Sequence, residues 1–453
     1  AVSDATRGIP WVNQSGGDYI LCLLFFAVSV ILYTTFGGFR AVVWTDVMQG
    51  LVMFAGVIIL LILTLQQVGG LGNATKELAK MTPPEFGTAA LHVENATQTG
   101  SEIKKGAWVR TADGKTMRLM DRAVIQPGET ASEPVEVVIL TTESDAAKVQ
   151  AEIETGITAR VTDSKEYAFG AGQEGVYLVP PGPHKSSPSG FLPVVLALSF
   201  FVFWNFSGAG QPSYMVRQMA YKSTVVLRRS IMMVAVYFTL IYFPLVLIFT
   251  SARVLIPGME YAADRAMPEM AATVTSNAGM PWLAGLLVAA PFAAVMSSVD
   301  SFLLLVSSSI VRDIYQQSIN PNATESRLKK LTYTVNIIVG VLIVFAVLNP
   351  PEFLQTLIIF ASAGLGCFLM PMIFALYWKR ATAGGIVAAM IAGAGTILVF
   401  YIIGKVVYDE FTAYELGGFH PFIWSMFVSA AVAIFFSLIG RQPDKTLVKK
   451  YFG

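Results

Sequence analysis

Residues 280–315, MPWLAGLLVAAPFAAVMSSVDSFLLLVSSSIVRDIY, decide the fold of this chain. The stretch is long and apolar enough to cross a bilayer, for which about 20 apolar residues suffice. It nevertheless contains an acid, Asp300, and a series of hydroxyl side chains. Small and polar residues recur in it at steps of three and four, which places them on one face of a helix. The residues on that face are Ala290, Ala294, Ser297, Ser298, Ser301, Leu305 and Ser308.

Two interpretations of this face compete. Small residues and hydroxyls let membrane helices pack closely and hydrogen-bond to one another, which explains the serines without any ligand. Alternatively, hydroxyl, carbonyl and carboxylate oxygens at membrane depth suit a hard monovalent cation. Asp300 favours the cation site, because a carboxylate in a span costs about 2.5–3.5 kcal/mol and by default marks an ion or proton pathway.

The composition is that of a polytopic membrane protein. Of the 453 residues, 54% are hydrophobic and 13% are charged, which is about half the charged share of a soluble domain. A formal net charge of +1 gives no reason to expect nucleic acid as a partner. Cys22 and Cys367 lie in apolar surroundings, and His92, His184 and His420 form no cluster. We therefore predict neither a disulfide framework nor a cysteine or histidine metal centre.

Apolar runs predict about nine membrane spans and one insert. Residues 1–70 contain a polar loop and two spans, separated by a break at Gly37-Gly38. Residues 71–189 are charged and rich in Pro, Gly and Thr, and residues 190–453 contain the remaining spans and a short basic tail. Within the insert, Asp113-Gly114 between two alternating arms predicts a β-hairpin. PVEVVIL reads as a strand and DAAKVQAEIE as a short helix, so we expect a small inserted α+β domain in an all-α membrane protein.

Basic residues in the short connections predict the orientation, because cytoplasmic loops carry an excess of Lys and Arg. They fall on alternate loops: Arg40; Arg217, Lys222, Arg228 and Arg229; Arg312, Arg327, Lys329 and Lys330; Lys379 and Arg380; and Arg441, Lys445, Lys449 and Lys450. We therefore expect a plasma-membrane protein with the N-terminus and the insert outside and the C-terminus in the cytoplasm. The insert could also bind a protein partner, and the sequence leaves this open.

Asp46 is a second acid near a span. It lies at the cytoplasmic start of the second span, where a carboxylate can simply cap the helix N-terminus. The functional interpretation places it in an ion site with the hydroxyl face around Ser298 and Ser301. The sequence alone does not show that the two helices touch.

The span FFVFWNFSGAGQPSYMVRQMAYKS is interrupted by glycines and a proline. A packing kink explains such a break without function. Unwound backbone at membrane depth, however, is tolerated only where it is buried in protein or lines a cavity, and transporters use such breaks as binding sites. The polar and aromatic residues beside this break are Trp204, Asn205, Ser207 and Gln211.

Three stretches together resemble the sodium/solute symporter family: YTTFGGFRAVVWTDVMQG, GQPSYMVRQMAYKS and AAPFAAVMSSVDSFLLLVSSSIVRDIY. The resemblance covers essentially all of the chain outside the insert. Two later segments, NPPEFLQTLIIFASAGLGCFLMPMIFALYWKRATAGG and GFHPFIWS, look most like the pantothenate branch. The resemblance implies a leucine-transporter-like fold, with two inverted repeats of five helices around a midplane site. In this comparison the first span corresponds to the fourth core helix, so we expect a chain that lacks the N-terminal core helices.

The resemblance also assigns site residues. Half of the common sodium site would come from Ala294 (carbonyl), Ser297 and Ser298. Some members bind a second sodium ion, and the matching residues are Asp46, Ser301 and Asp300. The residues on the broken helix that would line the substrate cavity are Trp204, Asn205, Ser207 and Gln211.

Sodium-coupled symport of a small carboxylate-bearing solute across the lipid bilayer, with pantothenate as the first candidate, is the predicted function. One alternative is a non-transporting membrane sensor on the same fold that signals through a protein partner. Another is a proton-coupled symporter that uses Asp46 and Asp300. An enzyme is not predicted, because no span has the spacing of a His, Glu or Cys site and the insert has no nucleophile motif.

Overall fold

The structure is a computed structural model that describes residues 17–93, 101–348 and 354–452. By internal contacts the chain divides into two compact units. Unit 1 comprises Ala1–Met53, Val195–Val236 and Ala289–Gly453, and unit 2 comprises Phe54–Val194 and Tyr237–Val288. Unit 2 combines the insert with parts of several membrane helices. The units therefore reflect which residues are in contact and do not correspond to continuous segments of the sequence. The sequence boundaries at residues 70 and 189 stay a prediction.

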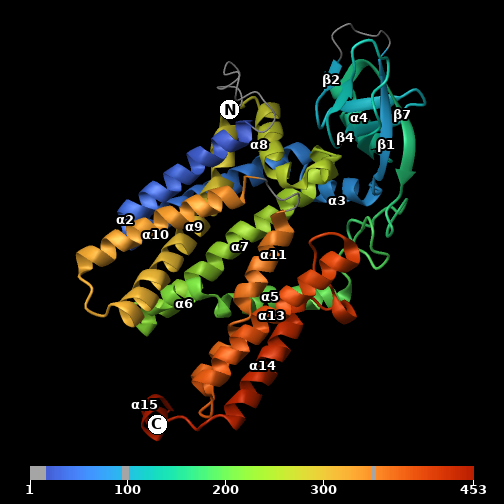
Figure 1. Cartoon of the computed structure of the whole chain (residues 1–453). Coiled ribbons are helices and arrows are strands. Elements are labelled where there is room, and N and C mark those ends of the chain that lie inside the picture. The colour runs from blue at the N-terminus through green and yellow to red at the C-terminus, as the bar shows by residue number, and fades with distance from the viewer. Residues whose placement is uncertain (1–16, 94–100, 349–353, 453) are drawn as a thin grey trace. The chain divides into compact units, whose positions relative to one another are not determined.

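The membrane helices are long and mostly uninterrupted (Figure 1). They and the short helices that follow them are α2 (Gly17–Val68), α5 (Val194–Gly210), α6 (Pro212–Met219), α7 (Thr224–Leu255), α9 (Leu283–Ser308), the π-helical continuation η4 (Ser309–Ile319), α10 (Glu325–Ala346), α11 (Leu354–Gly366), α12 (Leu369–Tyr377), α13 (Ala383–Tyr408), α14 (Pro421–Ile439) and α15 (Lys445–Phe452). Among the described residues, seven helical runs are long and apolar enough to cross a membrane, or eight if the bent pair α5 and α6 forms one span.

A kink at Gly38 divides α2 into two helical arms. Its φ of 63° and ψ of −166° lie outside the helical region, and glycine reaches such angles at little cost because it has no Cβ. The break predicted at Gly37-Gly38 is therefore confirmed. When the two arms of α2 are counted separately and the bent pair α5 and α6 is counted as one span, the described helices give nine candidate spans, the number expected from the sequence.

The predicted interruption of the next span is also confirmed. α5 ends at Gly210, Gln211 is extended with φ −79° and ψ 124°, and α6 starts at Pro212. Proline is favoured at the first position of a helix because it has no N–H to leave unpaired there. The axes of α5 and α6 differ by 47°. At the break the Gln211 N–H donates to the Gly208 carbonyl at 3.1 Å, three residues back, in place of the carbonyl four residues back that a regular α-helix would use.

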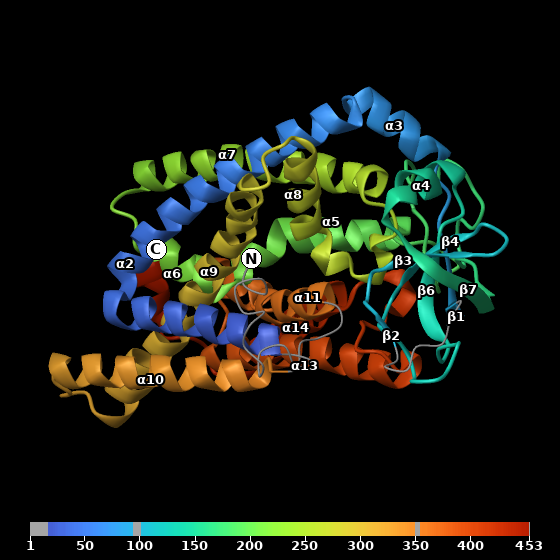
Figure 2. The same ribbon diagram turned by 90° about the horizontal axis from the view of Figure 1, so that it is seen from above.

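In unit 1, α13 and α14 lie side by side along their length (Figure 2). Small residues allow the close approach. The Ser425 hydroxyl donates to the Gly393 carbonyl at 2.9 Å, and the Ser429 hydroxyl donates to the Ala389 carbonyl at 3.0 Å. Helix packing thus explains these two buried serines. The same explanation is the alternative to an ion site for the serines of α9.

Within unit 2 the insert forms a closed β-barrel with strand order β1-β6-β4-β3-β7, drawn in cyan and green in Figure 1. Its elements are α3 (Leu71–Lys80), β1 (Glu85–Val93), β2 (Ser101–Ile103), β3 (Trp108–Thr111), β4 (Thr116–Leu119), β5 (Ala123–Ile125), β6 (Val135–Ile139), α4 (Glu143–Lys148), η1 (Gln150–Glu152) and β7 (Ile153–Lys165). The strand predicted from PVEVVIL is β6.

The predicted hairpin is present: β3 and β4 pair antiparallel, and Gly114 in their turn has a φ of +92°. The helix predicted over DAAKVQAEIE is shorter than expected. α4 ends at Lys148, a 3₁₀ turn follows, and Ile153 already opens β7. Apolar side chains from β1, β3, β4, β6 and β7 fill the barrel, and Leu91, Met117 and Leu119 are fully buried.

The barrel is held to the connection that follows α7. Arg118 of β4 donates to the carbonyls of Gly106 at 3.0 Å and Pro257 at 3.4 Å, and its guanidinium lies 5.0 Å from the centre of the Trp108 ring. A Cβ on Gly258 would come within 2.7 Å of the Trp108 ring, so the two segments are in tight contact. The end of α7, the later part of α2, α8 (Ala266–Asn277) and the start of α9 share one apolar core.

Candidate ion site

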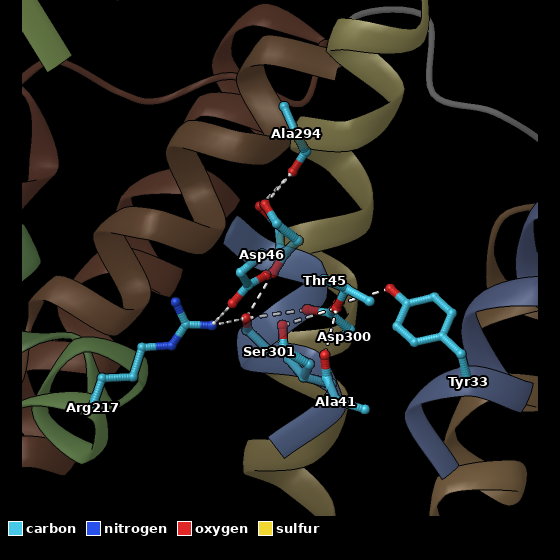
Figure 3. Close-up of polar contacts among 11 residues, drawn as sticks. Tyr33, Ala41, Thr45, Asp46, Arg217, Ala294, Asp300 and Ser301 are labelled. Carbon is cyan, nitrogen blue, oxygen red and sulfur yellow. Dashed lines mark hydrogen bonds and ion pairs between the residues drawn. The ribbon is translucent and has the colours of Figure 1, made fainter. Parts of the chain in front are cut away.

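In unit 1, α2, α6 and α9 bring together the two acids predicted from the sequence. Asp46 comes from α2, Asp300 and Ser301 come from α9, and Arg217 of α6 lies against them. Figure 3 shows the guanidinium pointing toward Asp46 and Ser301, while Tyr33 approaches Asp300 from the other side. The structure therefore answers the question that the sequence left open, because α2 and α9 do touch.

Asp300 is fully buried and accepts hydrogen bonds from neutral groups. The Tyr33 hydroxyl donates to Oδ2 at 2.7 Å. The Ser301 hydroxyl lies 3.2 Å from Oδ1 and 2.6 Å from the Ser297 carbonyl, either of which can accept its single proton. Hydrogen bonds to a charged acceptor contribute about 1.5–3 kcal/mol, so these two donors offset part of the cost of burying the carboxylate.

Asp46 is paired on one oxygen only. Arg217 Nη2 donates to Oδ2 at 2.8 Å and also contacts the Ser301 hydroxyl. The Oδ1 atom is buried and has no hydrogen-bond partner among the described residues. A buried carboxylate oxygen without a donor is costly, and it marks a position where a cation or a protonated group would be stabilised.

The three residues expected at the common sodium site lie within about one turn of α9. The hydroxyls of Ser297 and Ser298 donate to the Ala294 carbonyl at 2.8 and 3.3 Å. The Ser297 carbonyl in turn lies beside Ser301. The predicted ligands that α9 provides for the two sodium ions are thus adjacent along this helix, whereas Asp46 comes from α2.

A cavity of about 230 Å³ reaches the site at Ser301. Its polar lining residues are Ser213, Arg217, Ser301 and Ser308, and the rest of the lining is apolar side chains of α2, α6 and α9. The side chain of Arg217 is 44% exposed, against 18% for Asp46. Arg217 is therefore the more solvent-accessible member of this ion pair.

The four residues expected at the substrate cavity differ in their surroundings. Trp204 and Asn205 are exposed on α5, and the Asn205 amide donates to the Phe201 carbonyl of its own helix at 2.7 Å. Ser207 is buried, and Gln211 is the extended residue at the break. The described contacts do not join these side chains into one cluster, so their role at a substrate site stays a prediction.

Sequence reasoning missed Tyr33 and Arg217. Arg217 counts in the sequence as one more cation of a short loop, and Tyr33 as one aromatic residue of an apolar span. The available signal was the buried acid itself, because a carboxylate at membrane depth needs a partner. It does not say which residue provides one. No group of three or more His, Cys, Asp or Glu side chains in the described part of the chain has the arrangement of a metal centre.

Several membrane helices, a broken span and carboxylate, hydroxyl and carbonyl oxygens at membrane depth define a secondary transporter. A model of the sodium:solute symporter family matches residues 12–110 and 154–393. The chain belongs to this family, whose members are sodium-using transport proteins and not enzymes.

Curated relatives agree with this assignment. The chain is 26% identical to the sodium/pantothenate symporter of Haemophilus influenzae over 96% of this chain and 67% of that protein. It is 27% identical to the sodium/pantothenate symporter of Escherichia coli over 96% of this chain and 68% of that protein. The osmoregulated proline transporter OpuE of Bacillus subtilis is 24% identical over 95% of this chain and 65% of its own length.

A solved structure of a substrate-bound, outward-open Na⁺-coupled sialic acid symporter has a similar fold. Its TM-score is 0.51 at 15% identity, over 95% of this chain and 69% of that chain. This supports the predicted leucine-transporter-like helical fold with a small sheet insert. At this identity the likeness concerns the fold alone.

Proposed function

We propose that this chain takes part in sodium-coupled uptake of a small carboxylate-bearing solute, with pantothenate as the first candidate. The observation that carries the proposal is the buried Oδ1 of Asp46, which has no hydrogen-bond partner among the described residues. The other oxygen of this carboxylate shares the Arg217 Nη2 donor with the Ser301 hydroxyl. The similarity to two sodium/pantothenate symporters over nearly the whole chain supports the choice of solute. Proline is the competing solute, since proline transporters are also similar.

Sodium is a transported ion in this proposal. One ion would be held by the Ala294 carbonyl with the hydroxyls of Ser297 and Ser298, which already lie within hydrogen-bond distance of that carbonyl. A second would take Asp46 with Ser301, and Asp300 would add negative charge close by. Neutral and charged oxygens of this kind suit a hard cation.

The solute would bind at the break between α5 and α6. Backbone groups freed by such a break, and the positive end of the following helix, are suited to a carboxylate. The assigned side chains are Trp204, Asn205, Ser207 and Gln211.

Coupling would follow from differential binding. Sodium stabilises the outward-open state, the solute then completes the site, and rocking of the two repeats exposes both to the inside. The membrane potential adds about 2.3 kcal/mol per charge per 100 mV. Uptake would therefore be driven both by the sodium gradient and by the interior-negative potential.

The first experiment measures the thermal unfolding midpoint of the purified protein in sodium chloride and in choline chloride at equal ionic strength. A ligand of the folded state at 100 times its dissociation constant stabilises by about 2.7 kcal/mol, so sodium should raise the midpoint. Asp46→Asn and Ser297→Ala should remove the rise. Asp163→Asn, an exposed acid of β7, should keep it. A rise that survives in both site variants would show that these residues do not bind sodium.

A transport measurement tests the solute. Proteoliposomes with an inward sodium gradient should accumulate labelled pantothenate, and excess unlabelled pantothenate should compete far better than proline. The reverse order of competition would assign the chain to proline. Absence of uptake with sodium binding intact would favour the sensor that the sequence leaves as an alternative.

Proton coupling is the second candidate, and the burial of Asp300 favours it. The side chains that hydrogen-bond to it are the neutral hydroxyls of Tyr33 and Ser301, so a proton on this carboxyl would relieve an uncompensated charge. Uptake driven by a pH gradient in choline buffer, and lost in Asp300→Asn, would establish it. Uptake that needs sodium at constant pH would exclude it.

A further inference from the structure

A basic cavity lies where three membrane helices of unit 1 end. Its volume is about 430 Å³. The residues that line it are Lys379, Arg380, Gln442, Pro443, Lys445, Val448, Lys449 and Phe452. Four of them are cationic, and among these described residues none is acidic. The cavity is therefore a concentration of positive charge that the transport proposal does not use.

The walls of the cavity are fixed by hydrogen bonds. Arg380, in the turn between α12 and α13, donates from Nη2 to the carbonyls of Leu438 at 3.1 Å and Gly440 at 3.0 Å, at the end of α14. Thr382 caps α13 by accepting from Gly385 N at 3.1 Å, and its own N–H donates to the Ser437 hydroxyl at 3.2 Å. The turn and the end of α14 thus form one side of the cavity.

Part of the positive charge has no partner in the part of the chain that the structure describes. Arg380 Nη1 is buried and has no acceptor among the described residues. The carboxylate of Asp444 is near in sequence, but it accepts from the N–H and the hydroxyl of Thr446 at 2.8 and 2.7 Å. Those bonds lower the pKa of Asp444, and they keep its carboxylate at the start of α15. Among the described residues, therefore, none provides a counter-ion inside the cavity.

The remaining wall is apolar. Val448 and Phe452 are one turn apart on α15 and half-buried, whereas Lys445 and Lys449 on the same helix are exposed. An amphipathic helix with lysines on its polar side is typical of a membrane interface. The ends of spanning helices lie near the polar headgroup region, so the cavity is placed at the depth of lipid phosphates.

We propose that this cavity binds the phosphate headgroup of an anionic membrane lipid. The phosphate would accept hydrogen bonds from the three exposed lysines and lie close to the positive charge of Arg380, since ionised donors and phosphate make strong charge-assisted hydrogen bonds. Val448 and Phe452 would pack against the glycerol and the first acyl carbons. Basic pockets beside spanning helices on the cytoplasmic side are suited to such headgroups. This inference does not depend on the proposed ion or solute.

The test uses the purified full chain in neutral detergent and a spin-labelled phosphatidylglycerol as the probe, with spin-labelled phosphatidylcholine for comparison. The cavity variant carries Lys379→Gln, Lys445→Gln and Lys449→Gln. The matched control carries Lys104→Gln, Lys105→Gln and Lys115→Gln, three exposed lysines of the insert. Both variants change the net charge equally. The expected result is at least tenfold weaker binding of phosphatidylglycerol by the cavity variant and a change of less than about twofold in the control.

Three results would overturn the proposal. Equal losses in the two variants would mean that bulk charge attracts the lipid. Equal binding of phosphatidylglycerol and phosphatidylcholine by the unaltered protein would mean that no headgroup is recognised. Displacement of the labelled lipid by millimolar inorganic phosphate would assign the cavity to a soluble phosphate. The unfolding midpoints in phosphatidylcholine should be the same for all three proteins, because the substituted lysines are exposed.

Discussion

Replacing Arg217 by methionine should tighten sodium binding. The guanidinium is bonded to Asp46 Oδ2 at 2.8 Å and contacts Ser301, so sodium must displace it to use these oxygens. A hydrogen bond to a charged group contributes about 1.5–3 kcal/mol. Because the Arg217 side chain is 44% exposed, solvent screening favours the lower end. Roughly 1.5 kcal/mol corresponds to about a tenfold lower sodium dissociation constant.

The assay is a sodium titration of the unfolding midpoint at constant ionic strength, with choline as the balancing cation. Arg229→Met, an exposed arginine of α7, is the matched control and should bind sodium as the unaltered protein does. An unchanged or weaker affinity in Arg217→Met, with a normal midpoint in choline, would refute the reasoning. Arg217 would then hold the Asp46 oxygens in position instead of competing with the ion.

Three further outcomes are expected, each read as an unfolding midpoint. Tyr33→Phe removes a donor from a buried carboxylate and should destabilise by about 1–3 kcal/mol; an unchanged midpoint would remove Tyr33 from the site. Gly404→Ala places a Cβ against the Thr412 carbonyl and should cost about 1–3 kcal/mol, whereas Gly395→Ala, whose Cβ meets nothing, should cost none. Burial lowers the pKa of His420 from 6.5 to about 4, so in that interval the unfolded chain binds a proton that the folded chain does not. Stability should fall as the pH drops from 6.5 toward 4, and His420→Asn should flatten this part of the profile.

Features set by neighbouring residues could be predicted from the sequence. The kink at Gly38, the turn at Gly114 and the break before Pro212 each follow from what glycine or proline permits in the backbone. The short helix after β6 was predicted too long. Its last residues, from Ile153, instead start β7, which pairs with β1 on one side and β3 on the other. That pairing is set by strands distant in sequence and leaves no local signal.

In the candidate site, too, contacts between residues distant in sequence could not be predicted. The acids and hydroxyls were found because polar residues are conspicuous in an apolar span. Their partners were not, since Tyr33 lies 267 positions from Asp300 and Arg217 lies 171 positions from Asp46. Which cation approaches which acid depends on how α2, α6 and α9 pack. Alternation of apolar and polar residues does not encode that packing.

The attachment of the barrel to the end of α7 has a practical consequence for imaging. A 49.0 kDa membrane protein surrounded by detergent gives few features by which single particles can be aligned. Here Arg118 and Trp108 are in contact with Pro257 and Gly258, so the barrel cannot tumble independently of that helix end. The barrel can therefore serve as a feature by which single-particle images are aligned. An antibody fragment bound to its outer strands would add mass that reports the position of α7 directly.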